Sequence, residues 1–331
     1  MDVGQGDGAL LISPLGETVL FDDGVRNDCD RVLAYLQQLG ISHIDYHIAS
    51  HYHDDHIGCA VKVLDEFHLK KQAFDRGSTY KSGTFTNYTN FVGILRKTAI
   101  EGSALTLDQS SANPVKIEFV ALNGNGVTTA DENDRSLVCV VRFGKFDAVM
   151  GGDLSGFNTS KYRDVETSVA PRFGRVEVYK VNHHGSQYSS NTNWLGILRP
   201  KAAIISCGDG NEYYHPTKQA LDRLHLFNVP TYWTERGNGT KPGANDKIGG
   251  NIIVEVEPMS SSFRIKYAWT NVDSYAVWGP PSGSQQEYAW SKNASVYHYP
   301  QCKYVKNIDP QNLERGATAP ANKTLHLGCP K

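Results

Sequence analysis

The 331-residue sequence contains no uninterrupted apolar run long enough to span a membrane. It opens with "MDVGQGD", which has neither the basic segment nor the apolar segment of a signal peptide. We therefore expect a soluble protein, either cytoplasmic or exported with a leader that is missing from this sequence. Nothing in the sequence decides between these two locations, and nothing in it indicates the oligomeric state.

The sequence also lacks a strong net charge. Its formal charge is −2, so the total charge does not by itself require a polyanionic partner. The charge is unevenly distributed, because residues 258–331 carry eight Lys/Arg against four Asp/Glu, whereas the preceding residues carry 25 against 31. The C-terminal tail is thus the basic part of an otherwise acidic chain.

Cysteine is scarce, and the six cysteines do not have the spacing of a disulfide framework. The first four stand in apolar or strand-like surroundings, where a thiol packs as a small apolar residue. We therefore predict ordinary core positions for Cys29, Cys59, Cys139 and Cys207.

The apolar content of 40% is ample for a large core, and the length suggests one large domain with an appendage, or two domains. Residues 8–23 have the pattern of a β-hairpin, and residues 28–40 that of an amphipathic helix ended by a glycine. Residues 70–112 are polar and predict an irregular surface excursion with a helix at 88–99. Because hairpins dominate, neither half has the pattern of a doubly wound parallel sheet.

The composition divides the chain into three parts. Residues 1–268 form the expected main domain, residues 269–288 are a linker by composition, and residues 289–331 form a small C-terminal module.

The segment "SHYHDDHIG" contains three histidines and two aspartates directly after a predicted buried strand. His51 and His53 lie two residues apart, so in extended backbone they point to the same side and can grip one cation. Asp55 and His56 follow the turn and can face the same cation or a second one. Imidazole and carboxylate suit Zn²⁺ and Mn²⁺, and we prefer a metal site to a solvated loop.

Two further polar clusters follow predicted strands. Asp153 ends "FDAVMGGD", and we interpret it as a bridging metal ligand rather than a helix cap, with the paired glycines letting the backbone pass close to a bulky neighbour. In "VNHHGS", neighbouring strand residues point opposite ways, so only one of His183 and His184 should ligate directly, and the other should either hydrogen-bond to a metal ligand or contact substrate. Gly185 and Ser186 are candidates for presenting backbone N–H groups to an anion.

The remaining candidates are weaker. His215 stands before Pro216 at a predicted helix entrance, where it is either a base or phosphate donor or a residue of the cap. Asn133 and Asp134 in "ENDRS" precede a predicted strand, where they are either turn residues or part of the site. Asp7 and Asp22 end apolar strands, and each is either a hydrogen-bond partner of a ligating imidazole or a turn aspartate.

Taken in order, "DVGQGD", "LFDDG", "SHYHDDHIG", "NDRS", "GGD", "NHHGS" and "CGDGNEYYHP" resemble the metallo-β-lactamase superfamily, and more narrowly the hydrolase domain of the ComEC/Rec2 competence proteins. The resemblance covers roughly residues 1 to 268. It implies an α/β fold, a four-layer αββα sandwich with metals at one edge, and a metal-activated water that attacks an ester-type bond.

The resemblance also implies roles for single residues. The implied metal ligands are His51, His53, Asp55, His56, Asp153 and His184, with Asp153 bridging. Asp55, His183 and His215 are the implied catalytic residues, and Ser186 joins His215 in contacting substrate. Many superfamily hydrolases carry a further histidine where this sequence reads "ENDRS". One or two divalent ions are therefore expected, with Zn²⁺ as the first expectation and Mn²⁺ as the alternative.

The tail resembles the small Ada-type metal-binding modules. His298, Cys302, His326 and Cys329 have spacings that fit a structural zinc, and a disulfide between the two cysteines is the alternative. Its positive charge and tyrosines suit contact with nucleic acid, and a small solvated cap is the plainer interpretation.

The competence-type resemblance implies phosphodiester hydrolysis, with DNA as the expected substrate. Hydrolysis of a small ester (a phosphocholine ester, a lactone or a β-lactam) is one alternative, and the acidic main domain favours it. A catalytically weak module that binds nucleic acid is the other.

Overall fold

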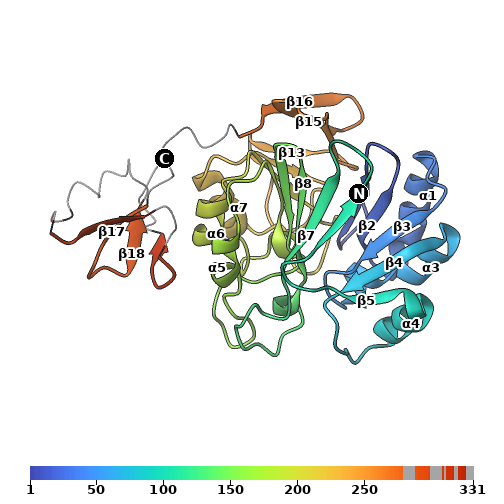
Figure 1. Cartoon of the computed structure of the whole chain (residues 1–331), viewed down its shortest axis with the longest axis horizontal. Helices are drawn as coiled ribbons and strands as arrows, with labels where there is room; N and C mark the ends of the chain where they lie inside the picture. The colour runs from blue at the N-terminus through green and yellow to red at the C-terminus, as the bar shows by residue number, and fades with distance from the viewer. Residues whose placement is uncertain (279–287, 299–307, 309–310, 317–319, 326–331) are drawn as a thin grey trace.

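The computed structural model describes residues 1–278, 288–298, 308, 311–316 and 320–325, and its two main sheets lie face to face between two groups of helices (Figure 1). The αββα order of layers expected from the resemblance is therefore confirmed. Each sheet mixes antiparallel and parallel neighbours.

The first sheet has five strands in the order β1-β2-β3-β4-β5. They are β1 (Gly8–Ile12), β2 (Thr18–Asp23), β3 (Ile44–Ile48), β4 (Leu69–Asp75) and β5 (Arg96–Thr98). β1 and β2 form the expected antiparallel hairpin, and β2 to β5 run parallel. The helices on its outer side are α1 (Cys29–Gln38), α3 (Ala60–Glu66) and α4 (Gly83–Val92), drawn in blue and cyan in Figure 1.

The second sheet has eight strands in the order β13-β12-β11-β10-β9-β8-β7-β6. They are β6 (Ala104–Leu107), β7 (Val115–Ala121), β8 (Val138–Phe143), β9 (Phe146–Met150), β10 (Val178–Lys180), β11 (Ala202–Ile205), β12 (Thr231–Trp233) and β13 (Asp246–Ile248). Neighbours from β6 to β9 are antiparallel and neighbours from β9 to β13 are parallel. Its outer helices are α5 (Glu166–Val169), α6 (Thr192–Leu198) and α7 (Lys218–Leu226).

Successive residues of β2 show how the layers pack. Leu20 belongs to the apolar cluster under α1, α3 and α4, whereas Val19 and Phe21 belong to the cluster between the two sheets. Side chains alternate between the faces of a strand, so a strand covered on both faces is apolar throughout its length. A third cluster, which contains Trp194 and Leu224, packs the second sheet against its helices.

The expected boundary after residue 268 falls inside a small sheet. This sheet consists of β14 (Ile253–Val256), β15 (Ser262–Tyr267) and β16 (Asn271–Ala276), with antiparallel neighbours. The beginning of the expected linker at 269–288 is therefore wrong, because residues 271–276 pair with β15. Asp273 and Tyr275, two residues apart, are half-buried there, whereas their neighbours in the strand are exposed, which is the pattern of a half-exposed strand rather than of a linker.

The C-terminal strands form a four-stranded sheet in the order β19-β17-β18-β20. They are β17 (Tyr288–Ser291), β18 (Val296–His298), β19 (Leu313–Gly316) and β20 (Thr324–Leu325). Tyr297 is buried in the cluster that contains Trp194, and its hydroxyl donates to Asn193 of α6. His298 is buried, whereas Cys302, His326 and Cys329 lie outside the described residues. The module at 289–331 and its zinc or disulfide stay predictions.

The prediction of an irregular excursion over residues 70–112 is wrong. The segment contains β4, α4, β5 and β6, and the helix expected at 88–99 ends earlier, at Val92. β5 is the edge of its sheet, and Lys70 and Lys71 of β4 are exposed. Polar residues at sheet edges were thus mistaken for a loop.

Two of the four cysteines expected in the core are bonded to each other. Cys29 and Cys59 form a disulfide, with their Cα atoms 5.3 Å apart, where α1 packs against α3. Their separation of 30 residues hides this proximity in the sequence. Cys139 and Cys207 are buried free thiols, as expected.

Among the described residues, no helix combines the length and apolar character that crossing a bilayer requires.

We predict that Cys29→Ala with Cys59→Ala lowers the free energy of unfolding by about 3 kcal/mol, since the bond closes a loop of 30 residues in the unfolded chain. Urea titrations with and without reductant measure this. The double variant should be insensitive to reductant. A wild-type midpoint that reductant leaves unchanged would contradict the bond.

Candidate metal centre

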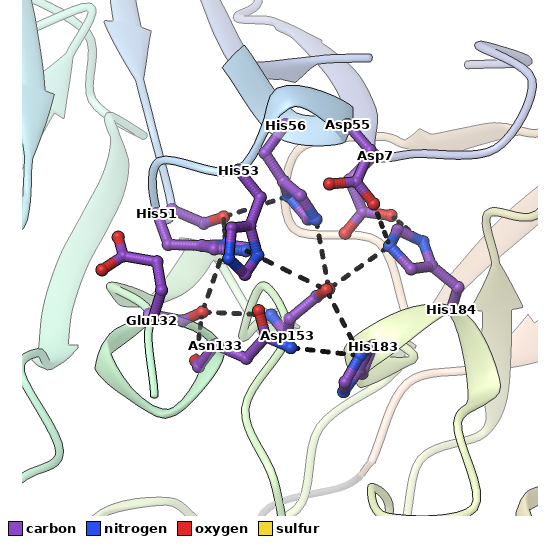
Figure 2. A network of polar contacts seen from close by, with 12 residues as sticks. Asp7, His51, His53, Asp55, His56, Glu132, Asn133, Asp153, His183 and His184 are labelled. Atoms are coloured by element: carbon purple, nitrogen blue, oxygen red, sulfur yellow. Dashed lines mark hydrogen bonds and ion pairs between the residues drawn. The ribbon is translucent and has the colours of Figure 1, made fainter. Parts of the chain in front are cut away.

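Loops from both sheets converge at one edge of the sandwich. The segment 51–56 follows β3 of the first sheet, whereas Asp153 follows β9 and residues 183–184 follow β10 of the second sheet. Ligand sites form at the carboxyl ends of parallel strands, because the connecting loops meet there. Figure 2 shows the side chains of these loops facing one another around Asp153.

Asp153 lies between two sets of imidazoles. Its Oδ1 is 3.2 Å from Nε2 of His56 and 3.5 Å from Nε2 of His184. Its Oδ2 is 4.0 Å from Nε2 of His51 and 3.8 Å from Nε2 of His183. The two oxygens of one carboxylate therefore face different histidines, which is the arrangement needed to bridge two cations.

The half of the site around Oδ1 has outer partners that orient its imidazoles. Nδ1 of His56 donates to Oδ2 of Asp22 at 2.8 Å. Nδ1 of His184 lies 3.2 Å from Oδ1 of Asp7 and donates to the Ser206 carbonyl at 3.1 Å. Because Nδ1 of each ring faces acceptors, Nε2 is the nitrogen left to bind a metal at the centre.

Several atoms of this half lack a hydrogen-bond partner although they are buried. They are Nε2 of His56, Nε2 of His184 and Oδ1 of Asp153. Ligand atoms of these three residues and of Asp55 all lie within 4.8 Å of one another. Buried nitrogen and oxygen atoms that converge without forming hydrogen bonds are costly unless something binds them, and they are the ligand types of Zn²⁺ and Mn²⁺. The residues present therefore fit a divalent cation.

The half around Oδ2 contains His51 and His53. Nε2 of His51 is 3.0 Å from Nδ1 of His53, and Nδ1 of His51 contacts the hydroxyls of Ser50 and Ser136 at 3.1 and 3.4 Å. The structure thus brings together all six residues expected as ligands. Their role as ligands stays a prediction.

His183 and His184 do not continue a strand, as the sequence argument assumed. Both have left-handed backbone, with φ of 53° and 51°, in the short 3₁₀ turn η5 (Asn182–Gly185). Both side chains consequently lie beside Asp153, on its two different oxygens. Only a few per cent of non-glycine residues have positive φ, so two in succession are a feature that alternation in a strand does not predict.

Asn133 lies at the position without the further histidine, and its Nδ2 is 3.2 Å from Nε2 of His183. Asp134 faces elsewhere, because its Oδ2 accepts from the Thr129 hydroxyl and from the Arg163 N–H. Of these two residues, Asn133 therefore reaches the centre and Asp134 supports the surrounding loop.

Ser186 does not present a free N–H to an anion. Its N–H donates to the His183 carbonyl at 2.8 Å, and its hydroxyl accepts from the Tyr188 N–H. This part of the sequence prediction is wrong because the tight turn uses the donor itself. A role of the Ser186 side chain in substrate binding stays a prediction.

His215 is buried with its ring centroid 5.6 Å from that of His183 and 6.0 Å from that of His184. Burial and the neighbouring imidazoles of His184 and His183 lower the pKa of His215 to about 3. A neutral imidazole at neutral pH has one N–H to donate and one nitrogen to accept a proton.

The carboxylates give the centre a strong preference for positive charge. Burial disfavours a protonated His184, but Asp153 and Asp7 outweigh burial and raise its pKa well above the usual value. Burial likewise opposes ionisation of Asp153, yet the imidazoles of His184 and His56 hold the pKa of that carboxyl well below its usual range. The charges that attract protons here would equally attract a metal cation.

Other residues of the site were not recognised in the sequence. Lys180 forms an ion pair with Asp7, and the hydroxyls of Ser50 and Ser136 contact His51. Gly152 is constrained by both serines, because an added Cβ would lie 2.8 Å from Oγ of either. The paired glycines in "GGD" had predicted a close neighbour of the backbone, but not that the neighbours are Ser50 and Ser136. Glu132, which accepts the N–H of Tyr52, had no local signal at all.

The layered fold and the His/Asp cluster define a metal-dependent type of hydrolase, and the comparisons agree with this class. The family model of the metallo-beta-lactamase superfamily matches residues 2–209, and the chain belongs to that superfamily. ComE operon protein 3 of Bacillus subtilis is 26% identical over 259 residues, which are 72% of this chain and 32% of that protein. Recombination protein 2 of Haemophilus influenzae is 29% identical over 232 residues, which are 69% of this chain and 26% of that protein.

The chain thus spans about a third of the length of these curated relatives. Among solved structures, a putative metal-dependent hydrolase from Parabacteroides distasonis matches with a TM-score of 0.39 and 15% identity, over 69% of this chain and 98% of that one. The assignment rests on the family match and on the ordered layers rather than on this likeness.

We predict that Asp153→Ala reduces the bound metal from about two ions per chain to less than one, since both halves share this carboxylate. Elemental analysis after gel filtration measures the content. Asp222 forms an exposed ion pair with Lys218, and Asp222→Ala is the control, which should keep the wild-type metal content. Equal metal in both variants would contradict the shared role.

The lowered pKa of His215 predicts a ring that stays neutral well into the acid range. Because this pKa is lower in the folded than in the unfolded chain, protons bind the unfolded chain more readily. The contribution of His215 to the free energy of unfolding is therefore complete above about pH 6.5 and is lost as the pH falls towards about 3. The imidazole resonances of His215, identified by their absence in His215→Gln, should not shift between about pH 8 and about pH 5. A titration near the ordinary histidine pKa would contradict this prediction.

Proposed function

We propose that this protein is a metal-dependent phosphodiesterase whose polymeric substrate is DNA. The observation that carries the proposal is Asp153, which turns one carboxylate oxygen to His56 and His184 and the other to His51 and His183. A carboxylate shared in this way suits two cations a few ångströms apart, the arrangement used for in-line displacement at phosphorus.

Divalent metal ions, when bound, supply an activated water and neutralise charge on the phosphoryl oxygens. The chain's own residues orient the reactants. Asp55 has a side chain 26% exposed, so its carboxylate borders both the ligand cluster and solvent, where it accepts a hydrogen bond from the nucleophilic water. It also lies 3.4 Å from Nε2 of His184, which restrains its direction.

The rings of His183 and His215 both lie beside that of His184, with centroids 6.3 and 6.0 Å from it. Their rings are in edge-to-face contact, and both pKa values are lowered by burial. Neutral imidazoles can donate an N–H hydrogen bond to a phosphoryl oxygen, whereas protonation of the leaving oxygen would need the imidazolium form that their lowered pKa values disfavour. We assign the positioning of the phosphoryl group to these two residues, together with the Ser186 side chain.

The relatives support nucleic acid as the substrate class. They include a recombination protein and a competence protein ComA of Neisseria gonorrhoeae, which is 25% identical over 239 residues. These names describe those longer proteins, and DNA as the substrate of this chain is our proposal.

One observation favours a second candidate. The 257 residues before the basic tail are net acidic, whereas a surface that follows a nucleic-acid backbone is usually lined with Lys and Arg. A hydrolase of a small ester, such as a phosphocholine ester, a lactone or a β-lactam, fits this charge better. A catalytically weak module that binds nucleic acid is the remaining alternative, and a protein that is purified without stoichiometric metal at this centre and has no turnover would favour it.

We predict that the wild-type protein hydrolyses bis-p-nitrophenyl phosphate, that a chelator stops the reaction, and that added Zn²⁺ or Mn²⁺ restores it. Asp55→Ala and His53→Ala should each lower kcat at least a hundredfold, about the contribution of one positioned catalytic group. Release of p-nitrophenolate measures the rate, and circular dichroism checks that each variant is folded. Asp222→Ala is the matched control and should retain the full rate.

Retained activity in either site variant would overturn the assignment of these residues. Single-stranded and double-stranded DNA, RNA and p-nitrophenylphosphocholine then separate the substrates. A kcat/KM on the choline ester far above that on every polynucleotide would replace the DNA proposal with the small-ester alternative.

A further inference from the structure

A buried ion pair lies directly behind the loop of His51 and His53. Arg76 follows β4 of the first sheet, and Glu132 precedes the short 3₁₀ turn η3 (Asn133–Arg135) of the second sheet. Nε of Arg76 donates to Oε1 of Glu132 at 2.9 Å, and its terminal NH2 donates to Oε2 at 2.6 Å. The residues are only 1% and 5% exposed. Such a bidentate pair has a fixed geometry.

Tyr52 connects this pair to the metal centre. It stands between His51 and His53 and is completely buried. Its backbone N–H donates to Oε1 of Glu132 at 3.0 Å, and the guanidinium of Arg76 lies 4.2 Å from the centre of its ring. The pair thus holds the one residue whose backbone sets the separation and direction of both histidines.

Glu132 has a second connection through its neighbour in sequence. Asn133 contacts Nε2 of His183 at 3.2 Å, and His183 faces Oδ2 of Asp153. Figure 2 shows Glu132 and Asn133 beside His51 and His53, away from Asp7 and Asp55. Glu132 is therefore connected to the Oδ2 half of the centre, through Tyr52 and through Asn133.

The Oδ1 half has different carboxylates behind it. His56 is held by Asp22 and His184 by Asp7, and among the described residues neither aspartate forms a hydrogen bond or an ion pair with Glu132 or Arg76. The nearest carboxylates therefore differ between the two halves, and the Ser50 hydroxyl, which donates to Asp22 and contacts Nδ1 of His51, is the link between Asp22 and the Oδ2 half.

We propose that Glu132 is a positioning residue that sets the metal affinity of the His51–His53 half independently of the Asp55–His56–His184 half. This inference rests on the proposed two-metal function. Outer partners of metal ligands typically change affinity by about tenfold to a hundredfold, because they restrict the orientation of the ligand. Here the restriction acts through the backbone of Tyr52.

The test uses the full chain with Glu132→Gln, which preserves the shape of the side chain and removes its charge. Zn²⁺ affinities of the two sites are measured by competition with a colorimetric chelator, and Co²⁺ absorption spectra report the surroundings of each ion. We expect one site to bind at least tenfold more weakly and the other to stay within about twofold. The spectrum of the weakened site should also change.

Two variants are matched controls. Glu177 is another buried glutamate that accepts two backbone N–H groups, from Asp147 and Trp278, outside the metal centre. Glu177→Gln should lower stability without changing either affinity. Asp7→Asn alters the support of His184 and should weaken the opposite site.

Should Glu132→Gln fail to fold, Arg76→Lys keeps the charge but loses the bidentate geometry, and it should weaken the same site. Equal weakening of both sites, unchanged affinities, or a wild-type protein that binds only one ion at this centre would overturn the inference. These affinities do not depend on turnover. Two distinct sites with the expected selective loss, but no hydrolysis of any phosphodiester, would overturn the proposed function alone.

Discussion

The sharing of one buried carboxylate between opposite sets of imidazoles is the constraint on which the rest of the site depends. Asp153 is 2% exposed, and a carboxylate at such a position must be compensated by positive charge. His56 and His184 supply it on one oxygen, and His51 and His183 lie around the other. The loops that deliver these rings follow strands of both sheets. The position of one sheet relative to the other therefore determines whether the four imidazoles meet.

Opposite charges also alternate in the layer of side chains around the centre. Asp22 and Asp7 orient His56 and His184, and Lys180 in turn balances Asp7. On the other side, Glu132 holds the backbone of Tyr52 and is balanced by Arg76. Every buried acid in this description thus faces either an imidazole or a basic side chain. A cation placed at the centre would complete this alternation of charge.

The parts of the site that could be predicted have local signals. The dense run from His51 to His56, and Asp153 behind its glycines, are unusual patterns that polar loops rarely contain. His183 and His184 were found, but their left-handed turn was not, since strand alternation implied opposite directions. Glu132 and Arg76 lie 56 residues apart, and a lone Glu or Arg in a sequence carries no signal of a long-range ion pair.

The same distinction applies to the fold. The hairpin of β1 and β2 and the helix α1 depend on neighbouring residues, and both were predicted correctly. Parallel pairing such as that of β3 with β4 depends on segments far apart, and the polar edge strands after residue 70 were mistaken for a loop. The disulfide of Cys29 and Cys59 was missed for a related reason, because only the packing of α1 against α3 brings these thiols together.

The origin of the candidate ligands on both sheets has a thermodynamic consequence. His51, His53, Asp55 and His56 follow the first sheet, and Asp153 and His184 follow the second, so no partly unfolded form that separates the sheets retains the full ligand set. An ion that requires all of these groups binds the closed sandwich but not a form in which the two layers have come apart. Its binding free energy is then added to the free energy of that opening, and it increases with the logarithm of the free ion concentration. The cohesion of the sandwich becomes a function of the metal supply around the protein.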